Sequence, residues 1–275
     1  MRKLEGKVAI VSGSGRGIGQ AIALKLAAEG ARVVVNDLDE APAAETVERI
    51  RAAGGTALAC VGDVTAPDFG ERFVNAAVEG LGGLDIIVNN AGYPWDAVVQ
   101  KMTDEQWYAM IDVHATAPFR ILRAAAEHIR AAAKREKDEG RPVTRKVVNV
   151  SSIAGLYGNA GQVAYSAGKA AIVGMTKTLA KEWGRYGVTV NAVAFGYIKT
   201  RITQPIGSGA EVADVGGRSI RMGVQPEMIQ AMERMIPLGR GGTPEEAAGA
   251  VYLFCCPESD YISGEVVLAS GGFVM

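Results

Sequence analysis

The feature that most constrains the fold of this chain is a repeated alternation of two kinds of segment. Short runs rich in β-branched residues alternate with longer Ala-rich segments whose apolar residues recur with helical spacing. The short runs are continuously apolar, which is typical of strands that are covered on both faces. The expected strands lie at 7–12, 32–37, 56–61, 84–90, 146–151, 188–194 and 265–270, and the expected helices at 17–29, 40–53, 67–80, 104–138, 162–184 and 244–256.

Repeated strand–helix units imply a parallel sheet with right-handed crossovers and helices on both faces. No linker or change of composition divides the 275 residues, of which 48% are hydrophobic, so we predict one domain over 1–275. The predicted fold class is α/β, a single doubly wound Rossmann-type domain with a parallel seven-stranded sheet. Residues 197–243, rich in Gly, Met and Arg, fall outside the alternation, and we predict that they form a flap over a site.

Charge and cysteine content narrow the range of partners. The 29 basic and 30 acidic residues nearly balance, which gives no electrostatic reason to expect a nucleic acid or an anionic membrane. No apolar run approaches the roughly 20 residues that span a bilayer. Cys60, Cys255 and Cys256 lack the spacing of metal ligands, and no signal peptide is visible, so we expect reduced thiols, no metal and a cytoplasmic location.

The stretch SGSGRGIG at 12–19 lies between the first expected strand and the first expected helix. Gly13, Gly17 and Gly19 would let the backbone turn tightly and approach a pyrophosphate, while the helix N-terminus supplies free N–H groups. A purely structural turn is the alternative for the glycines alone. The order of strand, loop and helix favours dinucleotide binding.

Asp37 ends the second expected strand, eighteen residues after Gly19. A carboxylate there can accept hydrogen bonds from the adenosine ribose hydroxyls and would repel a 2′-phosphate, which favours NAD over NADP. Arg16 could instead reach a 2′-phosphate, so NADP stays possible. A structural role for Asp37, as a cap on the helix that begins near Glu40, is also open.

A third group of residues suits acid–base chemistry. Tyr165 and Lys169 are four residues apart on an expected helix and therefore share one face. A phenol titrates near pH ~10 on its own, and a neighbouring ammonium favours the phenolate and lowers that pKa. Ser152 ends the fifth expected strand, at the carboxyl edge of the sheet, where its hydroxyl can donate to a substrate oxygen. Such Tyr–Lys pairs are common on helices, so the pair by itself is weak evidence.

Five motifs in this order and spacing resemble those of the short-chain dehydrogenase/reductase family. They are SGSGRGIG at 12–19, GDVT at 62–65, NNAG at 89–92, Ser152 with YSAGK at 165–169, and FGYIKT at 195–200. The resemblance covers nearly the whole chain and is nearest in appearance to 3-oxoacyl-(acyl-carrier-protein) reductases. It implies an NAD- or NADP-dependent oxidoreductase of alcohols and ketones that assembles as a homotetramer.

The resemblance also implies roles for individual residues. Tyr165 would be the general acid–base, Ser152 the donor that orients the substrate, and Lys169 a group that tunes Tyr165 and holds the nicotinamide ribose. His114 stands where the family has an Asn, the fourth catalytic member. The residues implied in cofactor binding are Gly13, Arg16, Gly17, Ile18, Gly19, Asp37, Asp63, Val64, Asn90, Ala91, Gly92, Tyr165, Lys169, Gly196, Ile198 and Thr200.

The departure at His114 is accompanied by a proline four residues later. Pro118 has no N–H to offer the carbonyl of residue 114, and its ring pushes a helical turn open. In the family, the main-chain carbonyl at this place holds a water that passes protons to the active-site lysine. We therefore predict a kink at 114–118 that keeps this carbonyl free and releases the His114 side chain to vary. A partly buried polar side chain beside a local kink is the alternative.

The substrate is less constrained than the cofactor. Apolar residues of the predicted flap, among them Ile202, Met222, Met228 and Met232, could enclose an apolar body or could simply pack the flap onto the domain. The leading hypothesis is an oxidoreductase of a secondary alcohol or ketone, which includes 3-oxoacyl thioesters, steroids and sugar alcohols. A nucleotide-binding scaffold without catalysis is the alternative from another class. A methyltransferase would not explain the YSAGK and NNAG motifs.

Overall fold

The predicted parallel sheet is present in a computed structural model, which describes residues 2–207 and 212–274. The seven strands lie in the order β3-β2-β1-β4-β5-β6-β9, and neighbouring strands are parallel. The fold class and all seven expected strands are confirmed. Their bounds are β1 Val8–Val11, β2 Arg32–Val35, β3 Ala57–Ala59, β4 Ile86–Asn89, β5 Arg145–Ser152, β6 Val188–Phe195 and β9 Val266–Ala269.

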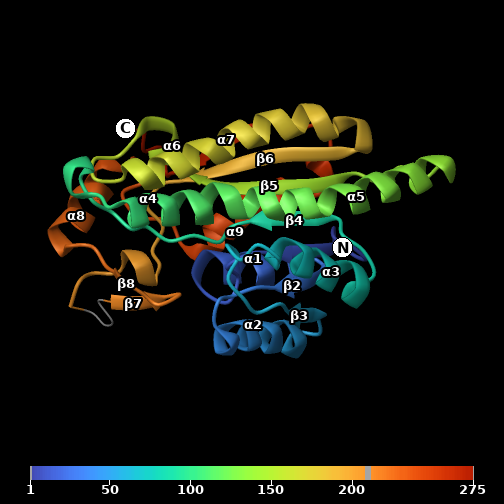
Figure 1. Cartoon of the computed structure of the whole chain (residues 1–275), viewed down its shortest axis with the longest axis horizontal. Coiled ribbons are helices and arrows are strands. Elements are labelled where there is room, and N and C mark those ends of the chain that lie inside the picture. Colours follow the sequence, from blue (N-terminus) through green and yellow to red (C-terminus); the bar gives the residue numbers. More distant parts are fainter. Residues whose placement is uncertain (1, 208–211, 275) are drawn as a thin grey trace.

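Helices cover both faces of this sheet (Figure 1). Ala9 and Val11 of β1 belong to one core, whereas Val8 and Ile10 belong to the other, because successive side chains of a strand point to opposite faces. The first core includes α1 (Gly17–Ala28), α2 (Glu40–Ala52) and α9 (Pro244–Leu253), and the second includes α3 (Phe69–Leu81), α4 (Asp104–Ile111), α5 (Ala117–Asp138) and α7 (Val163–Trp183). No helix within residues 2–207 and 212–274 has the length and apolar character that a membrane span requires.

The helix expected at 104–138 is divided by a π-helical turn. α4 ends before this turn, which spans Asp112–Thr116, and α5 follows it. The N–H of Ala117 donates to the carbonyl of Asp112, five residues earlier. The wider turn brings Pro118 into the first turn of α5, where an N–H would have no helical partner to lose. The predicted interruption is therefore present as a π turn, and the chain continues as a helix on both sides of it.

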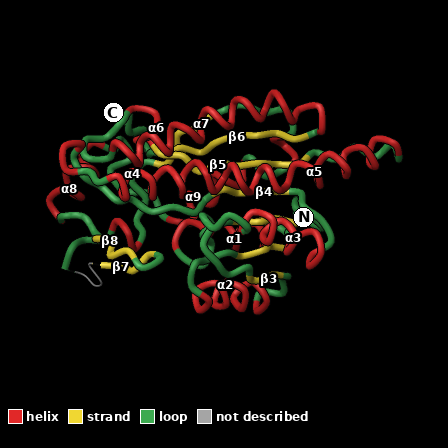
Figure 2. Tube along the Cα trace, viewed as in Figure 1, coloured by secondary structure: helices red, strands yellow, loops and turns green. Residues whose placement is uncertain are grey.

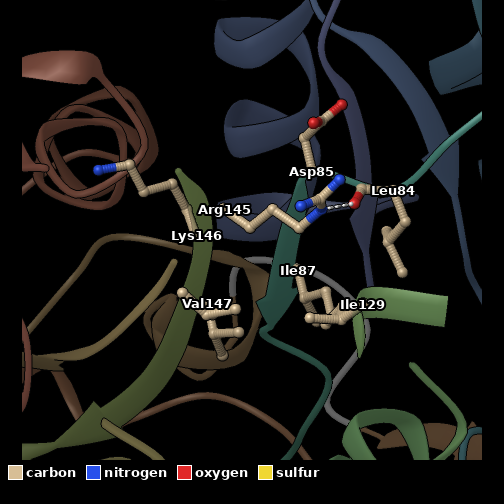
Figure 3. A pocket seen from close by; sticks show the side chains of 8 residues that line it. Leu84, Asp85, Ile87, Ile129, Arg145, Lys146 and Val147 are labelled. Atoms are coloured by element: carbon tan, nitrogen blue, oxygen red, sulfur yellow. Dashed lines mark hydrogen bonds between the residues drawn. The ribbon is translucent and has the colours of Figure 1, made fainter. Parts of the chain in front are cut away.

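The last turns of α5 extend past the sheet (Figures 1 and 2). An ion pair anchors this extension, because Nη1 of Arg145 at the start of β5 donates to Oε2 of Glu136 over 2.8 Å. Nε of Arg145 also donates to the carbonyl of Leu84 over 3.1 Å (Figure 3). The hollow drawn in Figure 3 is too small to admit a water molecule. These contacts support the sheet at the edge where β5 begins, which is opposite the carboxyl ends of the strands.

The predicted flap region contains a hairpin and a helix that the sequence pattern did not reveal. β7 (Val212–Val215) and β8 (Arg218–Arg221) pair antiparallel, and α8 (Pro226–Met235) follows them. Figure 1 shows these elements gathered beyond the carboxyl end of β6. Nζ of Lys199 lies 2.8 Å from Oε1 of Glu233, and this ion pair holds α8 to the first residues of the predicted flap. Residues 208–211 of the predicted flap lie outside the described residues.

A short helix after β5 and the end of β6 complete the surroundings of the site. α6 (Ile153–Tyr157) follows β5 directly, and the side chain of Ser152 is its N-cap. Phe195 at the end of β6 is buried and is paired with Ser152 of β5 on one side and Ala269 of β9 on the other. The end of β6 is therefore held from both sides before the chain enters the flap.

Candidate active site

A large cleft with a volume of about 1220 Å³ runs along the carboxyl edge of the sheet. Its wall contains every residue to which the sequence and the family resemblance assigned a catalytic or cofactor-binding role. These residues come from separate loops and helices, all of which follow strands that run in one direction. Parallel strands end at one edge of the sheet, and this brings the loops together.

The glycine loop that opens α1 depends on residues without a Cβ at three positions. Gly13 and Gly17 have φ values of 62° and 55°, which residues with a Cβ rarely adopt. A Cβ on Gly19 would lie 2.0 Å from the carbonyl oxygen of Gly13, and a Cβ on Gly13 would lie 2.8 Å from Cα of Ala91. The bare backbone and the N-terminus of α1 thus form a cradle that fits a pyrophosphate.

The side chain of Ser12 joins the glycine loop to the loop after β4. Its Oγ accepts hydrogen bonds from the N–H groups of Asn90, over 3.0 Å, and Ala91, over 3.1 Å. The amide nitrogen of the Asn90 side chain donates to the carbonyls of Ser12 and Gly13 over 2.9 and 3.0 Å. The hydroxyl at position 12 therefore holds the cofactor channel in place.

Asp37 lies at the end of β2 and is held within reach of the glycine loop. Its Oδ1 accepts a hydrogen bond from the N–H of Asp39 over 3.1 Å, and it lies 3.8 Å from Nη1 of Arg16. Nη2 of Arg16 also lies 2.9 Å from Asp39, so two carboxylates hold this guanidinium. The N-cap of α2 is Asp39, so Asp37 is not its cap.

Two neighbours of Asp37 escaped the sequence analysis. A Cβ on Gly15 would lie 2.4 Å from Oδ2 of Asp37, so this glycine allows the carboxylate to approach the loop. Oδ1 of Asn36 accepts a hydrogen bond from the N–H of Gly13 over 3.0 Å, and its Nδ2 donates to the carbonyl of Cys60 over 3.0 Å. Asn36 belongs to none of the sequence motifs, and its position next to Asp37 is the only signal that could have identified it.

Ser152, Tyr165 and Lys169 meet in the middle of the cleft. The Ser152 hydroxyl accepts a hydrogen bond from the N–H of Ala154 over 3.2 Å. Nζ of Lys169 donates to the carbonyl of Val150 over 2.9 Å and lies 5.8 Å from the centre of the Tyr165 ring. The structure thus brings together the three residues that the sequence singled out for acid–base chemistry.

Burial controls the pKa values of Tyr165 and Lys169. It raises the pKa of Tyr165 to about 12; a hydrogen bond with Ser152 lowers this pKa, and the charge of Asp96 raises it. Burial also lowers the pKa of Lys169 to about 8. The expectation that the lysine brings the pKa of the phenol below its usual value is wrong for this structure, because burial disfavours the phenolate. The phenol keeps its proton at neutral pH.

His114 is packed tightly against this group. Its Nε2 lies 3.0 Å from the carbonyl oxygen of Tyr93, so we assign the ring proton to this nitrogen. The ring stands edge-on to that of Tyr165, with centres 5.0 Å apart, and the side chain is 2% exposed. A Cβ on Gly92 would lie 2.3 Å from Cε1 of His114. The prediction that this side chain is released to vary is therefore wrong, because packing holds it.

Burial also determines the charge of His114. It lowers the pKa of the imidazole well below its usual range, and the nearby Lys169 charge acts in the same direction. The imidazole is therefore neutral at neutral pH, with one nitrogen donating to Tyr93 and the other, Nδ1, buried without a hydrogen-bond partner within the described part of the chain.

The remaining cofactor candidates lie toward the two ends of the cleft. Oδ1 of Asp63 accepts a hydrogen bond from the N–H of Thr65 over 2.8 Å, which shapes the loop after β3. Thr200 faces the glycine loop, because a Cβ on Gly17 would lie 3.9 Å from its methyl group. The carbonyl of Ile198 accepts a hydrogen bond from the Thr203 hydroxyl over 2.6 Å.

The flap supplies an apolar wall beside the catalytic group. Ile220 packs into the interior and is 1% exposed, so this flap residue is part of the core. The cleft is also lined by Tyr93, Asp96 and Gln162, which were not singled out from the sequence, and by Arg218 of β8, which the sequence offered as a contact for a phosphate-bearing carrier. The apolar residues of the flap and the chain end that line the cleft are Ile202, Met222, Val224, Met228, Met232, Met235, Ile236, Phe273 and Val274.

Known proteins resemble this chain over its whole length. A family model described as short chain dehydrogenase matches residues 7–211. A 3-oxoacyl-(acyl-carrier-protein) reductase of Synechocystis sp. is 36% identical over 277 residues, covering 100% of both chains. The short-chain reductase protein NovJ of Streptomyces niveus is 39% identical over 265 residues, which are 96% of this chain and 93% of the relative.

Solved structures agree with these sequence matches. A putative gluconate dehydrogenase from Agrobacterium tumefaciens superposes with a TM-score of 0.81 at 31% identity, and the match covers 98% of this chain and 96% of that protein. A dehydrogenase/reductase from Sinorhizobium meliloti superposes with a TM-score of 0.83 at 32% identity, with the same coverage of 98% and 96%.

Proposed function

This chain belongs to the short-chain dehydrogenase family, and from that premise we propose that it is an NAD-dependent oxidoreductase that interconverts 3-oxoacyl and 3-hydroxyacyl thioesters. The family consists of nicotinamide-dependent oxidoreductases that act on alcohol and carbonyl groups. The observation that carries the proposal is the position of Ser152, Tyr165 and Lys169 in one cleft, between the glycine loop and the apolar flap wall.

The chain's own residues supply orientation and proton transfer. The hydroxyls of Ser152 and Tyr165 would both donate to the substrate oxygen, and Tyr165 would deliver its proton as the alcohol forms. The charge of Lys169 would stabilise the phenolate that remains, and His114 supports the edge of the phenol ring. When bound, the nicotinamide supplies or accepts the hydride.

The choice of an acyl thioester is supported by the apolar flap wall and by the relatives that carry the name 3-oxoacyl-(acyl-carrier-protein) reductase. The test is NADH consumption with thioesters of N-acetylcysteamine of increasing acyl length, beside a 3-ketosteroid and a keto sugar. We expect kcat/KM to rise up to about fourfold per added methylene, because burial of one contributes ~0.8 kcal/mol. Binding of NADH without consumption of any compound would favour a non-catalytic scaffold.

The choice of NAD rests on Asp37 and on the two acids that hold Arg16. We expect the protein to bind NADH more tightly than NADPH, and we expect Asp37→Ala to narrow that difference by about tenfold because a like charge near the 2′-phosphate is lost. Fluorescence titration with both cofactors measures the difference. Asp39→Ala is the matched control, since it loosens Arg16 but keeps Asp37. A preference of the unmodified protein for NADPH would show that Arg16 dominates.

We also propose a homotetramer, which the family resemblance implies. Val267 and Leu268 on the edge strand β9 are 43% and 38% exposed, and Tyr108 and Phe119 beside the π turn are 63% and 49% exposed. Apolar surfaces of this kind at a sheet edge and on a helix pair are suited to subunit contacts. We expect light scattering at micromolar concentration to give the mass of four chains, and a monomer there would contradict the proposal.

A further inference from the structure

Asp96 occupies a fixed place beside the catalytic group. Its carboxylate lines the same cleft as Ser152 and Tyr165, and Oδ2 accepts a hydrogen bond from Nε2 of Gln162 over 2.7 Å. The neighbouring Ala97 forms a parallel bridge with Gln162. These contacts fasten the loop after β4 to the start of α7, the helix that carries Tyr165. The carboxylate therefore keeps its position relative to the phenol.

Asp96 has no cationic partner among the side chains that the structure describes. None of the lysine and arginine side chains described in the structure lies within 4.0 Å of its carboxylate oxygens, and its hydrogen-bond donor Gln162 is neutral. Burial raises the pKa of Asp96, and the hydrogen bond with Gln162 opposes this shift. The charge of Asp96 in turn raises the pKa of Tyr165, so its field reaches the phenol.

Two cationic groups of the cleft wall, Lys169 and Arg218, have partners of their own. Nζ of Lys169 donates to the carbonyl of Val150 over 2.9 Å. Nε of Arg218 on β8 lies 3.5 Å from Oε1 of Glu105. A substrate carboxylate that binds near Asp96 would meet a negative charge that no described lysine or arginine pairs with, and like charges repel.

We propose that Asp96 sets the substrate class of this site by excluding 3-oxo acids with a free carboxylate and admitting neutral 3-oxo esters and thioesters. The proposal rests on the function proposed above, because it concerns the substrate of the same site. The side chain is accessible from the cleft, so a bound substrate can approach it. It acts by charge and takes no part in proton or hydride transfer.

The test compares 3-oxohexanoate with its methyl ester, which differ in charge at one end. NADH consumption would give kcat/KM for both compounds with the unmodified protein and with Asp96→Asn. We expect the unmodified protein to prefer the ester by more than tenfold, and Asp96→Asn to reduce that preference by about tenfold, because an amide of the same shape keeps the contact with Gln162 but carries no charge.

Two control variants separate charge from structure. Asp96→Glu keeps the charge and should keep the preference for the ester. Asp104→Asn removes a carboxylate from the first turn of α4, outside the cleft wall, and should leave the preference unchanged. Equal slowing of both compounds by Asp96→Asn would mean that the residue only supports Gln162, and this result would overturn the proposal.

The failure of this proposal is distinguishable from failure of the proposed function. If the unmodified protein reduces the acid as readily as the ester, the oxidoreductase function stands and the role of Asp96 is refuted. If it binds NADH but reduces neither compound nor the thioesters, the proposed function is refuted, and the role of Asp96 with it.

Discussion

Replacement of Tyr165 by phenylalanine should reduce kcat by about 10²–10⁴-fold while leaving NADH binding nearly unchanged, because the variant loses only the hydroxyl that transfers the proton. The ring that remains can keep its edge contact with His114, at 5.0 Å between centres, so the cleft should keep its shape. Steady-state kinetics with a thioester and fluorescence titration with NADH measure the two effects separately. Substantial activity in this variant would exclude Tyr165 as the acid–base.

His114→Asn is the matched comparison for Tyr165→Phe. An asparagine amide can still donate toward the carbonyl of Tyr93, which the imidazole contacts at 3.0 Å, but it cannot replace the edge contact with the phenol ring. We expect a modest fall in kcat, far smaller than that of Tyr165→Phe. A loss as large as that of Tyr165→Phe would show that the imidazole itself transfers a proton.

Replacement of Lys169 by alanine should weaken both turnover and NADH binding. The ammonium lies 5.8 Å from the centre of the Tyr165 ring, where it can stabilise a phenolate, and the family resemblance places it on the nicotinamide ribose as well. The variant also leaves the carbonyl of Val150 without the donor it now has at 2.9 Å. We expect kcat to fall by at least about a hundredfold and the Kd of NADH to rise.

Lys169→Met is the control for the packing part of this effect. Methionine has a similar length and fills the same buried space, but it has neither charge nor N–H. It should match the alanine variant in turnover and in NADH affinity if charge and hydrogen bonding are responsible. Recovery of NADH affinity in Lys169→Met alone would show that the lysine supports the cofactor site by packing.

Much of the fold was predictable because local patterns and the global architecture agree. The runs that form β1, β4 and β6 are buried along their whole length and are mostly apolar, and their period differs clearly from that of the helices between them. Strands that all run in one direction must end at one edge, and this rule alone places the glycine loop, Asp37 and Ser152 in one cleft.

The flap was less predictable because its elements are short and partly exposed. β7 and β8 have four residues each, with Gly216 and Gly217 in positive-φ conformations between them, and a run of this length has too few residues to show a period. The role of Gly15 was also not predictable from a local pattern. It depends on the carboxylate of Asp37, which follows another strand and would lie 2.4 Å from a Cβ at position 15.

The sequence by itself determined the fold class, the glycine loop and the identity of the three acid–base residues, because each depends on spacing along the chain. The tertiary structure decided the burial, the pKa values and the packing of these residues. Burial raised the pKa of Tyr165 to about 12 and lowered that of Lys169 to about 8, and packing against Gly92 held the His114 ring in place. It also set Asp96 in the same cleft as the phenol, with no ion pair to any described lysine or arginine. Desolvation and contacts between distant segments depend on the arrangement of the whole chain in space, which a local pattern does not contain.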